Sequence, residues 1–161
     1  MREGGEKEAQ MADPEIRVNT PRILLADDHP HILSNLCRLA ETAGEVVGAA
    51  ADGRAAVEES HRLHPDVVVL DLVMPGVDGL EAARLLRRSL PDCKVVICSM
   101  HTTPDLIAEA FAAGAAGFVR KQSAHADLAP AIRAALSGER FVSPSLRYEG
   151  QEGDAGSATT S

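Results

Sequence analysis

Short apolar runs alternate with longer amphipathic segments through the middle of the sequence. Five runs of three to five residues have this character: Ile23–Ala26, Val46–Ala50, Val67–Leu70, Val95–Cys98 and Gly117–Val119. Because strands that alternate with helices form parallel sheets, the pattern predicts an α/β protein. The run Val67–Leu70 is apolar throughout and mostly β-branched, which is typical of a strand covered by helices on both faces. We therefore expect a doubly wound, five-stranded parallel sheet with this run at its centre.

The segments between the runs carry helix signals. Apolar residues at helical spacing predict helices over Ile32–Ala43, Leu80–Leu90 and Leu128–Leu136, and alanine-rich composition predicts another over Asp105–Ala116. Stop signals follow three of them. Gly44 is a candidate cap for the first helix, Pro91 ends the second of these segments, and Gly138 follows the last.

Composition narrows the class of protein. The 161 residues carry 16 basic and 24 acidic side chains, a net charge of −8, which disfavours a nucleic-acid binder that depends on phosphate contacts alone. One Tyr, three Phe and no Trp leave little material for base stacking. Three cysteines without a CxxC pair indicate a reducing compartment. With no signal peptide and no membrane span in the sequence, we expect a cytoplasmic protein.

The two ends differ in composition from the middle. Residues 1–20 are polar and unpatterned, and the sequence from Glu149 onward is rich in Gly, Ser and Thr. Such segments bury too little apolar surface to offset the entropy of ordering. We therefore expect one folded domain over residues 21–143, between a disordered N-terminal tail over 1–20 and a flexible C-terminal tail over 144–161.

Polar residues follow four of the predicted strands. They are Asp27 and Asp28 after the first run, Asp71 after the third, Ser99 after the fourth and Lys121 after the fifth. In a doubly wound sheet these positions meet at the carboxyl edge. Three crowded carboxylates need a cation, and oxygen ligands with room for water suit Mg²⁺. An aspartate beside Mg²⁺ and a lysine can act as a nucleophile toward phosphorus, because both cations neutralise the transferring oxygens.

These residues also carry a resemblance to a known family. Asp27-Asp28-His29-Pro30, Asp71-Leu72-Val73-Met74-Pro75-Gly76-Val77-Asp78-Gly79, Cys98-Ser99-Met100-His101 and Gly117-Phe118-Val119-Arg120-Lys121 together resemble the receiver domain of two-component response regulators. The resemblance covers about Arg22 to Ser143 and is close to the LuxR-type (NarL/FixJ-like) branch. It implies a flavodoxin-like sheet with strand order 2-1-3-4-5.

The resemblance implies a role for each site residue. Asp71 would accept a phosphoryl group from a histidine kinase or phosphotransfer protein, and Lys121 would hold the phosphate. Mg²⁺ would be bound by Asp28, by Asp71, by the Val73 carbonyl and by Asp27 partly through water. We expect no enzyme activity beyond self-phosphorylation and self-dephosphorylation.

Two further residues are implied to act as a switch. The Ser99 hydroxyl would move toward the phosphate while the Phe118 ring turns inward, which repacks the face of the fourth helix, fifth strand and fifth helix. That face would bind a downstream protein or a second copy. Taken alone, Ser99 could instead be a strand-end hydroxyl with a local hydrogen bond, and a phenylalanine such as Phe118 is more often simply a core residue.

Several alternatives stay open. An aspartate-nucleophile phosphatase needs a second acid two residues after the nucleophile, where this chain has Val73. The linker-like Gly138–Pro144 favours a receiver cut from a DNA-binding regulator, although the 17 residues after Pro144 are too few for a helix-turn-helix, so we expect no direct DNA binding by this chain. Asp27 and Asp28 could instead cap a helix.

Histidines raise one more alternative, a metal site of a different kind. His61 and His64 are three residues apart, and His29 and His31 lie near the acidic pair. Two observations count against this alternative. No cysteine or third histidine stands at ligand spacing, and His61 and His64 also suit the C-terminal end of a helix. The cysteines are expected to be inert thiols.

Overall fold

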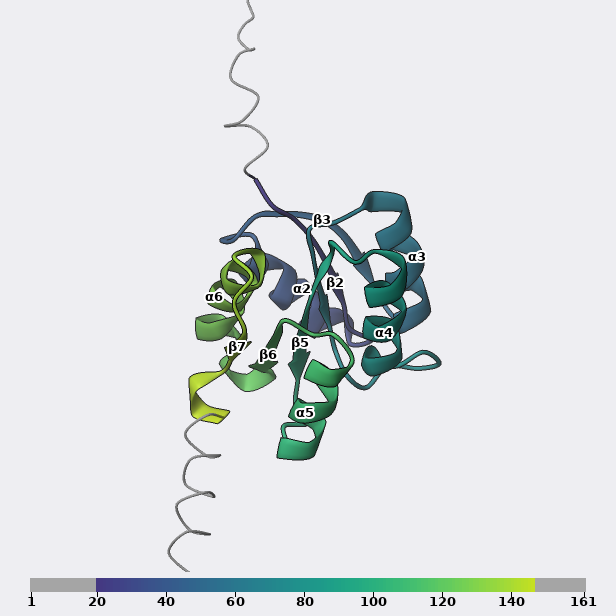
Figure 1. Cartoon of the computed structure of the whole chain (residues 1–161). Coiled ribbons are helices and arrows are strands. Elements are labelled where there is room, and N and C mark those ends of the chain that lie inside the picture. The colour runs from purple at the N-terminus through teal and green to yellow at the C-terminus, as the bar shows by residue number, and fades with distance from the viewer. Residues whose placement is uncertain (1–19, 147–161) are drawn as a thin grey trace, which may run out of the picture.

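The computed structural model describes residues 20–146 of the chain (Figure 1). The predicted tails therefore fall almost entirely outside the described residues. The strands are β2 (Arg22–Ala26), β3 (Glu45–Ala50), β4 (Val67–Leu70), β5 (Lys94–Ser99), β6 (Gly117–Arg120) and β7 (Phe141–Val142). The helices are α2 (Pro30–Ala40), α3 (Gly53–Leu63), α4 (Gly79–Ser89), α5 (Pro104–Ala112) and α6 (Ala124–Leu136), with a short 3₁₀ turn over Lys121–Ser123.

The strands form one parallel sheet in the order β3-β2-β4-β5-β6-β7. Helices α2 and α6 cover one face, and α3, α4 and α5 cover the other (Figure 1). This arrangement confirms the α/β doubly wound prediction, and the first five strands have the order that the resemblance implied. β4 lies inside the sheet and is buried at all four positions, as its unbroken apolar run indicated.

The sheet has six strands, so the prediction of five is one short. β7 adds to the outer edge of β6, where the Phe141 amide donates to the Ala116 carbonyl at 3.2 Å and the Ser143 amide donates to the Phe118 carbonyl at 3.0 Å. Ser143 is fully buried, and its hydroxyl accepts a bond from the Arg120 amide at 2.9 Å. A two-residue strand is too short to show a period of two, which is why the sequence pattern missed it.

The two faces of the sheet hold two separate apolar cores. Leu24, Val68 and Ile97 point toward the α3–α4–α5 side, whereas the neighbouring Ile23 and Val69 point toward α2 and α6. This alternation follows from the pleat of a strand, which sends successive side chains to opposite faces. Both cores hold the carboxyl ends of the central strands in fixed positions. In the described part of the chain, residues 20–146, every helix is too short or too polar to span a bilayer.

Local signals set the helix ends, with one correction. Gly138 follows α6 with a φ of 80°, and Gly114 follows α5 with a φ of 109°, so both stand where a side chain would be strained. Gly44 is not a cap, because α2 already ends at Ala40. A Cβ atom at Gly44 would lie 2.5 Å from the Pro21 carbonyl oxygen. Glycine is required there for close approach of two backbone segments.

Candidate functional site

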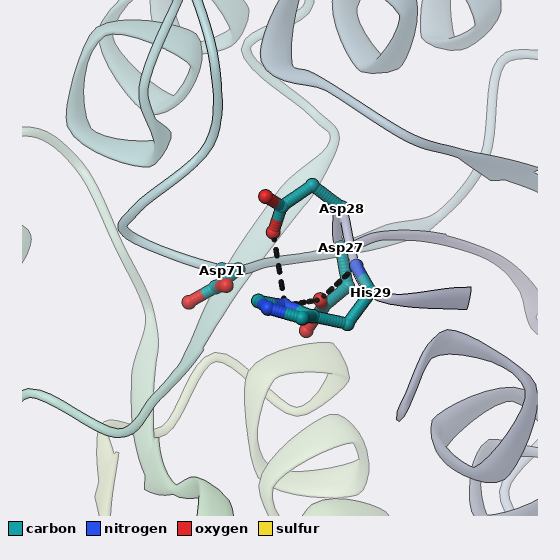
Figure 2. Close-up of side chains that lie close together, drawn as sticks. All are labelled: Asp27, Asp28, His29 and Asp71. Atoms are coloured by element: carbon teal, nitrogen blue, oxygen red, sulfur yellow. Dashed lines mark hydrogen bonds and ion pairs between the residues drawn. The ribbon is translucent and has the colours of Figure 1, made fainter. Parts of the chain in front are cut away.

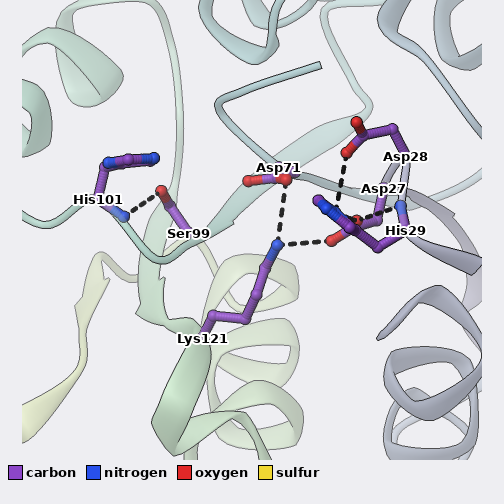
Figure 3. A network of polar contacts seen from close by, with 7 residues as sticks. All are labelled: Asp27, Asp28, His29, Asp71, Ser99, His101 and Lys121. Atoms are coloured by element: carbon purple, nitrogen blue, oxygen red, sulfur yellow. Dashed lines mark hydrogen bonds and ion pairs between the residues drawn. The ribbon is translucent and has the colours of Figure 1, made fainter. Parts of the chain in front are cut away.

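The polar residues predicted at strand ends do meet at the carboxyl edge of the sheet. Asp27 follows β2, Asp71 follows β4, Ser99 ends β5, and Lys121 follows β6. Figure 3 shows the three charged side chains directed at one another, with Ser99 beside them. Parallel strands make this convergence possible, because all their carboxyl ends share one edge.

Lys121 is the centre of the cluster. Its ammonium nitrogen lies 2.6 Å from Asp27 Oδ2 and 3.1 Å from Asp71 Oδ2 (Figure 3). The exposed fractions of the three side chains are 7% for Lys121, 0% for Asp27 and 7% for Asp71. The single ammonium of Lys121 therefore neutralises only one of the two buried carboxylates. The three side chains together keep a net negative charge.

Burial and charge act against each other at this cluster. Burial raises the pKa of Asp71, and the nearby Lys121 opposes that rise without cancelling it. Burial also acts to lower the pKa of Lys121, but the bond to Asp27 and the charge of Asp71 outweigh it, so the pKa of Lys121 is raised. Lys121 is therefore held in its charged form, while Asp71 is a more basic carboxylate than a solvent-exposed one.

Asp28 completes the acidic set and offers a free ligand atom. Its Oδ1 atom is buried and accepts no hydrogen bond from the described residues. His29 Nδ1 lies 3.1 Å from this oxygen, a contact that counts as an ion pair only when the ring is protonated. Figure 2 shows Asp27, Asp28 and Asp71 grouped around the His29 ring. Oxygens from three carboxylates, one of them unpartnered, fit a divalent cation.

His29 joins the acidic group, although the sequence raised it only within the alternative of a histidine metal site. Its amide donates to Asp27 Oδ1 at 2.9 Å, and its Nδ1 atom lies 3.3 Å from the same oxygen (Figure 2). One ligand atom each from Asp27, Asp28, His29 and Asp71 lies within 4.8 Å of all the others. The signal for His29 was its place next to the acidic pair, but a single histidine carries little weight in a sequence.

The helix-capping interpretation of Asp27 and Asp28 is wrong. The residue that caps α2 is His29, whose side chain makes no capping bond. Asp27 instead accepts one hydrogen bond from the His29 amide and another from the Lys121 ammonium. The capping role belongs to other residues, since Asp52, Asp78 and Thr103 each accept an amide bond at the start of α3, α4 and α5.

Ser99 and Phe118 are both fully buried. The Ser99 hydroxyl accepts a bond from the His101 amide at 2.9 Å (Figure 3), so it is bound to its own loop. Phe118 lies in the core between the sheet and the α3–α4–α5 layer. In this state the two residues match the simpler interpretations, a strand-end hydroxyl and a core ring.

Two apolar side chains stand open beside the acidic cluster. Val73 is 57% exposed and Met100 is 52% exposed. The Val73 backbone also makes a hydrogen bond to the Asp71 carboxylate, which favours the ionised form of that group. Met100 lines a shallow pocket with Lys121, His31 and Asn35. Exposed apolar groups therefore lie near the cluster, with Val73 two residues after Asp71 and Met100 in the same pocket as Lys121.

The other proposed chemical groups do not assemble in the described part of the chain. His61 Nε2 lies 2.8 Å from the Ser89 hydroxyl, and His64 is the left-handed residue after α3. Within residues 20–146 the acidic edge is the one cluster with metal-ligand geometry, so His61 and His64 form none. Burial raises the pKa of the Cys93 and Cys98 thiols to about 12, which keeps both protonated and unreactive at neutral pH.

Comparison with known proteins places this site in context. Residues 23–133 match the family model described as the response regulator receiver domain. The response regulator GacA of Pseudomonas viridiflava is 39% identical over 130 residues, which cover 80% of this chain and 61% of that protein. The response regulator UvrY of Escherichia coli is 37% identical over 79% of this chain and 59% of its own length. The chain thus spans about three-fifths of these relatives.

Solved structures give the same result. A two-component response regulator of the LuxR family from Aurantimonas superposes with a TM-score of 0.79 and 39% identity, over 85% of this chain and 99% of that one. The signal receiver domain of the putative response regulator NarL from Mycobacterium tuberculosis has a TM-score of 0.71 and 34% identity, over 74% of this chain and 98% of that one.

Proposed function

Because the chain belongs to the family of response regulator receiver domains, we propose that Asp71 accepts a phosphoryl group from a histidine kinase or a phosphotransfer protein. A receiver is a signalling domain rather than a typical enzyme. The observation that carries the proposal is the Lys121 ammonium, which lies within 3.1 Å of two buried carboxylates at the carboxyl edge of the sheet.

The transfer uses an oxygen of Asp71 as the nucleophile. It attacks phosphorus, the bond from phosphorus to the imidazole nitrogen of the donor breaks, and that nitrogen keeps the electron pair and takes up a proton. Lys121 neutralises charge on the transferred oxygens and orients the acceptor carboxylate. Mg²⁺ bound by Asp28, Asp71, the Val73 carbonyl and, partly through water, Asp27 would supply further charge neutralisation.

The proposed switch begins at the Ser99 hydroxyl. Its bond to the His101 amide must break before the hydroxyl can turn toward a phosphate on Asp71. The space it leaves would admit the Phe118 ring, which repacks the face formed by α5, β6 and α6. β7 pairs along the outer edge of β6, so this output face includes β7. A downstream protein or a second copy of the chain would bind there.

A DNA-binding role of the whole protein is a second candidate, which the comparisons do not favour over the receiver function. The two-component response regulator RcsB has been solved as a complex with DNA, and this chain aligns with 67% of that chain at 28% identity. The receiver would then control a DNA-binding partner or domain. A gel-shift assay with the full gene product at physiological salt, with and without phosphodonor, tests this candidate: a phosphorylation-dependent shift supports it, and no shift contradicts it.

Phosphorylation is tested directly with acetyl phosphate and Mg²⁺, followed by intact mass spectrometry. The wild-type chain should gain one phosphoryl group, and Asp71→Asn should gain none. Asp28→Asn should slow labelling by weakening metal binding, whereas Asp92→Asn, at an exposed acid in the turn before β5, should leave it unchanged. Labelling that persists in Asp71→Asn contradicts the proposal.

A further inference from the structure

We infer that His29 is a nitrogen ligand at the acidic edge, so that the site binds borderline transition-metal ions such as Zn²⁺ or Co²⁺ in addition to Mg²⁺. The inference rests on the metal site of the proposed function and adds a residue and a class of cation to it. The ligand set would be Asp27, Asp28 and His29, with Asp71 beside them.

Distances between the ligand atoms support this set. His29 Nδ1 lies 3.1 Å from Asp28 Oδ1 and 3.3 Å from Asp27 Oδ1. Ligand atoms held about 2.1 Å from one metal ion stand about 3.0 Å apart at octahedral angles and about 3.4 Å apart at tetrahedral angles. Each of the two separations therefore matches neighbouring corners of a coordination polyhedron, and one ligand atom from each residue of the group lies within 4.8 Å of the others.

The backbone holds the His29 ring at the cluster. The His29 amide is bonded to Asp27 Oδ1, and the residue has extended φ and ψ of −102° and 110° directly before Pro30. Pro30 opens α2 and restricts His29 to extended geometry. The ring is 65% exposed overall, so an ion can reach it from solvent while its Nδ1 edge faces the carboxylates (Figure 2).

The net negative charge of the cluster and an unpartnered carboxylate oxygen both favour a bound cation at the acidic edge. The three carboxylates face one ammonium, and Lys121 occupies Oδ2 of Asp27 but leaves Oδ1 directed at His29. One divalent ion would balance the two remaining negative charges. It would also give Asp28 Oδ1, which is buried and accepts no hydrogen bond from the described residues, a partner.

Donor chemistry then decides the class of ion. Carboxylate and carbonyl oxygens alone suit Mg²⁺, whereas imidazole nitrogen suits Zn²⁺, Co²⁺ and similar ions. A given set of nitrogen and oxygen ligands binds several divalent first-row metal ions with appreciable affinity, so tight Zn²⁺ binding by itself is no evidence for His29. The informative quantity is the part of the Zn²⁺ affinity that disappears when His29 is removed.

Isothermal titration calorimetry of the full chain measures that part. We expect His29→Ala to weaken Zn²⁺ binding at least about tenfold, since the loss of even a residue that only orients a ligand costs 10–100-fold. Mg²⁺ affinity should change by less than about twofold, because its oxygen ligands remain. His31→Ala is the matched control: His31 is an exposed histidine in the first turn of α2 and lies outside the ligand group.

Nitrogen-15 chemical shifts of the His29 ring provide a second readout that is independent of affinity. Zn²⁺ should shift Nδ1 of His29 strongly and leave the His31 ring in place. Unchanged His29 shifts at Zn²⁺ saturation, or equal Zn²⁺ affinity of wild type and His29→Ala, overturn the inference. If Mg²⁺ still supports labelling of Asp71 in that case, the proposed function stands and only the role of His29 is lost. Failure of both cations to bind would instead contradict the proposed function.

Discussion

A Cβ atom at Gly79 would lie 2.1 Å from the carbonyl oxygen of Asp71. Gly79 begins α4, and its amide donates to the Leu72 carbonyl at 2.9 Å. The start of α4 is therefore packed directly against the backbone of the proposed acceptor. No side chain fits between them, so glycine at this position sets where the Asp71 carboxylate stands.

Gly79→Ala should consequently damage both the fold and the site. The backbone must move by more than an ångström to admit a methyl group, and overpacking of this kind costs about 1–3 kcal/mol. We expect that loss in the free energy of unfolding by urea, together with slower labelling of Asp71 by acetyl phosphate. Gly117→Ala is the matched control, because a Cβ atom there meets nothing closer than 3.6 Å. Equal stability of the two variants would contradict the steric argument.

Asp71→Asn should stabilise the protein at neutral pH when Mg²⁺ is removed by a chelator. Burial raises the pKa of Asp71 above its ordinary value of 3.8. A carboxyl group with a raised pKa makes its full contribution to stability at pH values below 3.8. That contribution is lost as the pH rises through the pKa of the group in the folded state. At pH 7 the ionised carboxylate therefore destabilises the fold, and an amide does not.

Thermal melts of wild type and Asp71→Asn at several pH values check this. The melting temperature of the variant should exceed that of wild type at pH 7, and the gap should narrow as pH falls toward 3.8. Asp92→Asn, at an exposed position, should show no gap. A variant less stable than wild type at pH 7 would mean that the bond from Lys121 outweighs the burial of Asp71.

Lys121→Met should have the opposite effect. It removes the ammonium and leaves the Asp27 and Asp71 carboxylates buried without a cation. Breaking a buried ion pair from one side costs about 3–5 kcal/mol. We expect a loss near the lower end of that range in chelator, with part of it restored by Mg²⁺. Lys94→Met, at a half-buried lysine on β5, should change stability much less and show no response to Mg²⁺.

Leu146→Ala should loosen β7 from the edge of β6. Leu146 is only 5% exposed and packs into the same core as Phe118. Large-to-small substitutions of this kind cost about 2–5 kcal/mol. Hydrogen exchange at the Phe141 and Ser143 amides, which bond to β6, should become faster by at least about tenfold. Ser145→Ala removes only a 3.4 Å contact with Arg120 and should leave that exchange unchanged.

Much of the fold follows from the sequence because its signals are local. The buried run of β4 and the periodicity of α2, α4 and α6 each reflect one element in contact with a core. Gly44 shows the limit of such signals. Its requirement comes from Pro21, which is distant in sequence and adjacent in space, so the residue was mistaken for a helix cap.

The site was predictable to a similar depth. Strand ends placed Asp27, Asp71 and Lys121 at one edge, since the topology of a parallel sheet fixes that edge. The orientation of side chains was not predictable. Ser99 is bonded to the His101 amide, and His29 turns its ring toward the acids. Both depend on the conformation of a loop, for which the sequence carries no periodic signal.

The sixth strand also determines where the polypeptide leaves the folded part. α6 carries the chain from the carboxyl edge of the sheet back to the opposite edge, and β7, parallel to β6, returns it. The end of β7 consequently lies at the carboxyl edge of the sheet, where the acidic cluster stands, whereas β2 begins at the opposite edge (Figure 1). A segment attached after Leu146 would therefore begin near the carboxyl edge of the sheet, where the proposed phosphorylation takes place. Phe118 lies on β6, directly beside β7, so a movement of its ring would need to pass through only one strand to reach that point of attachment.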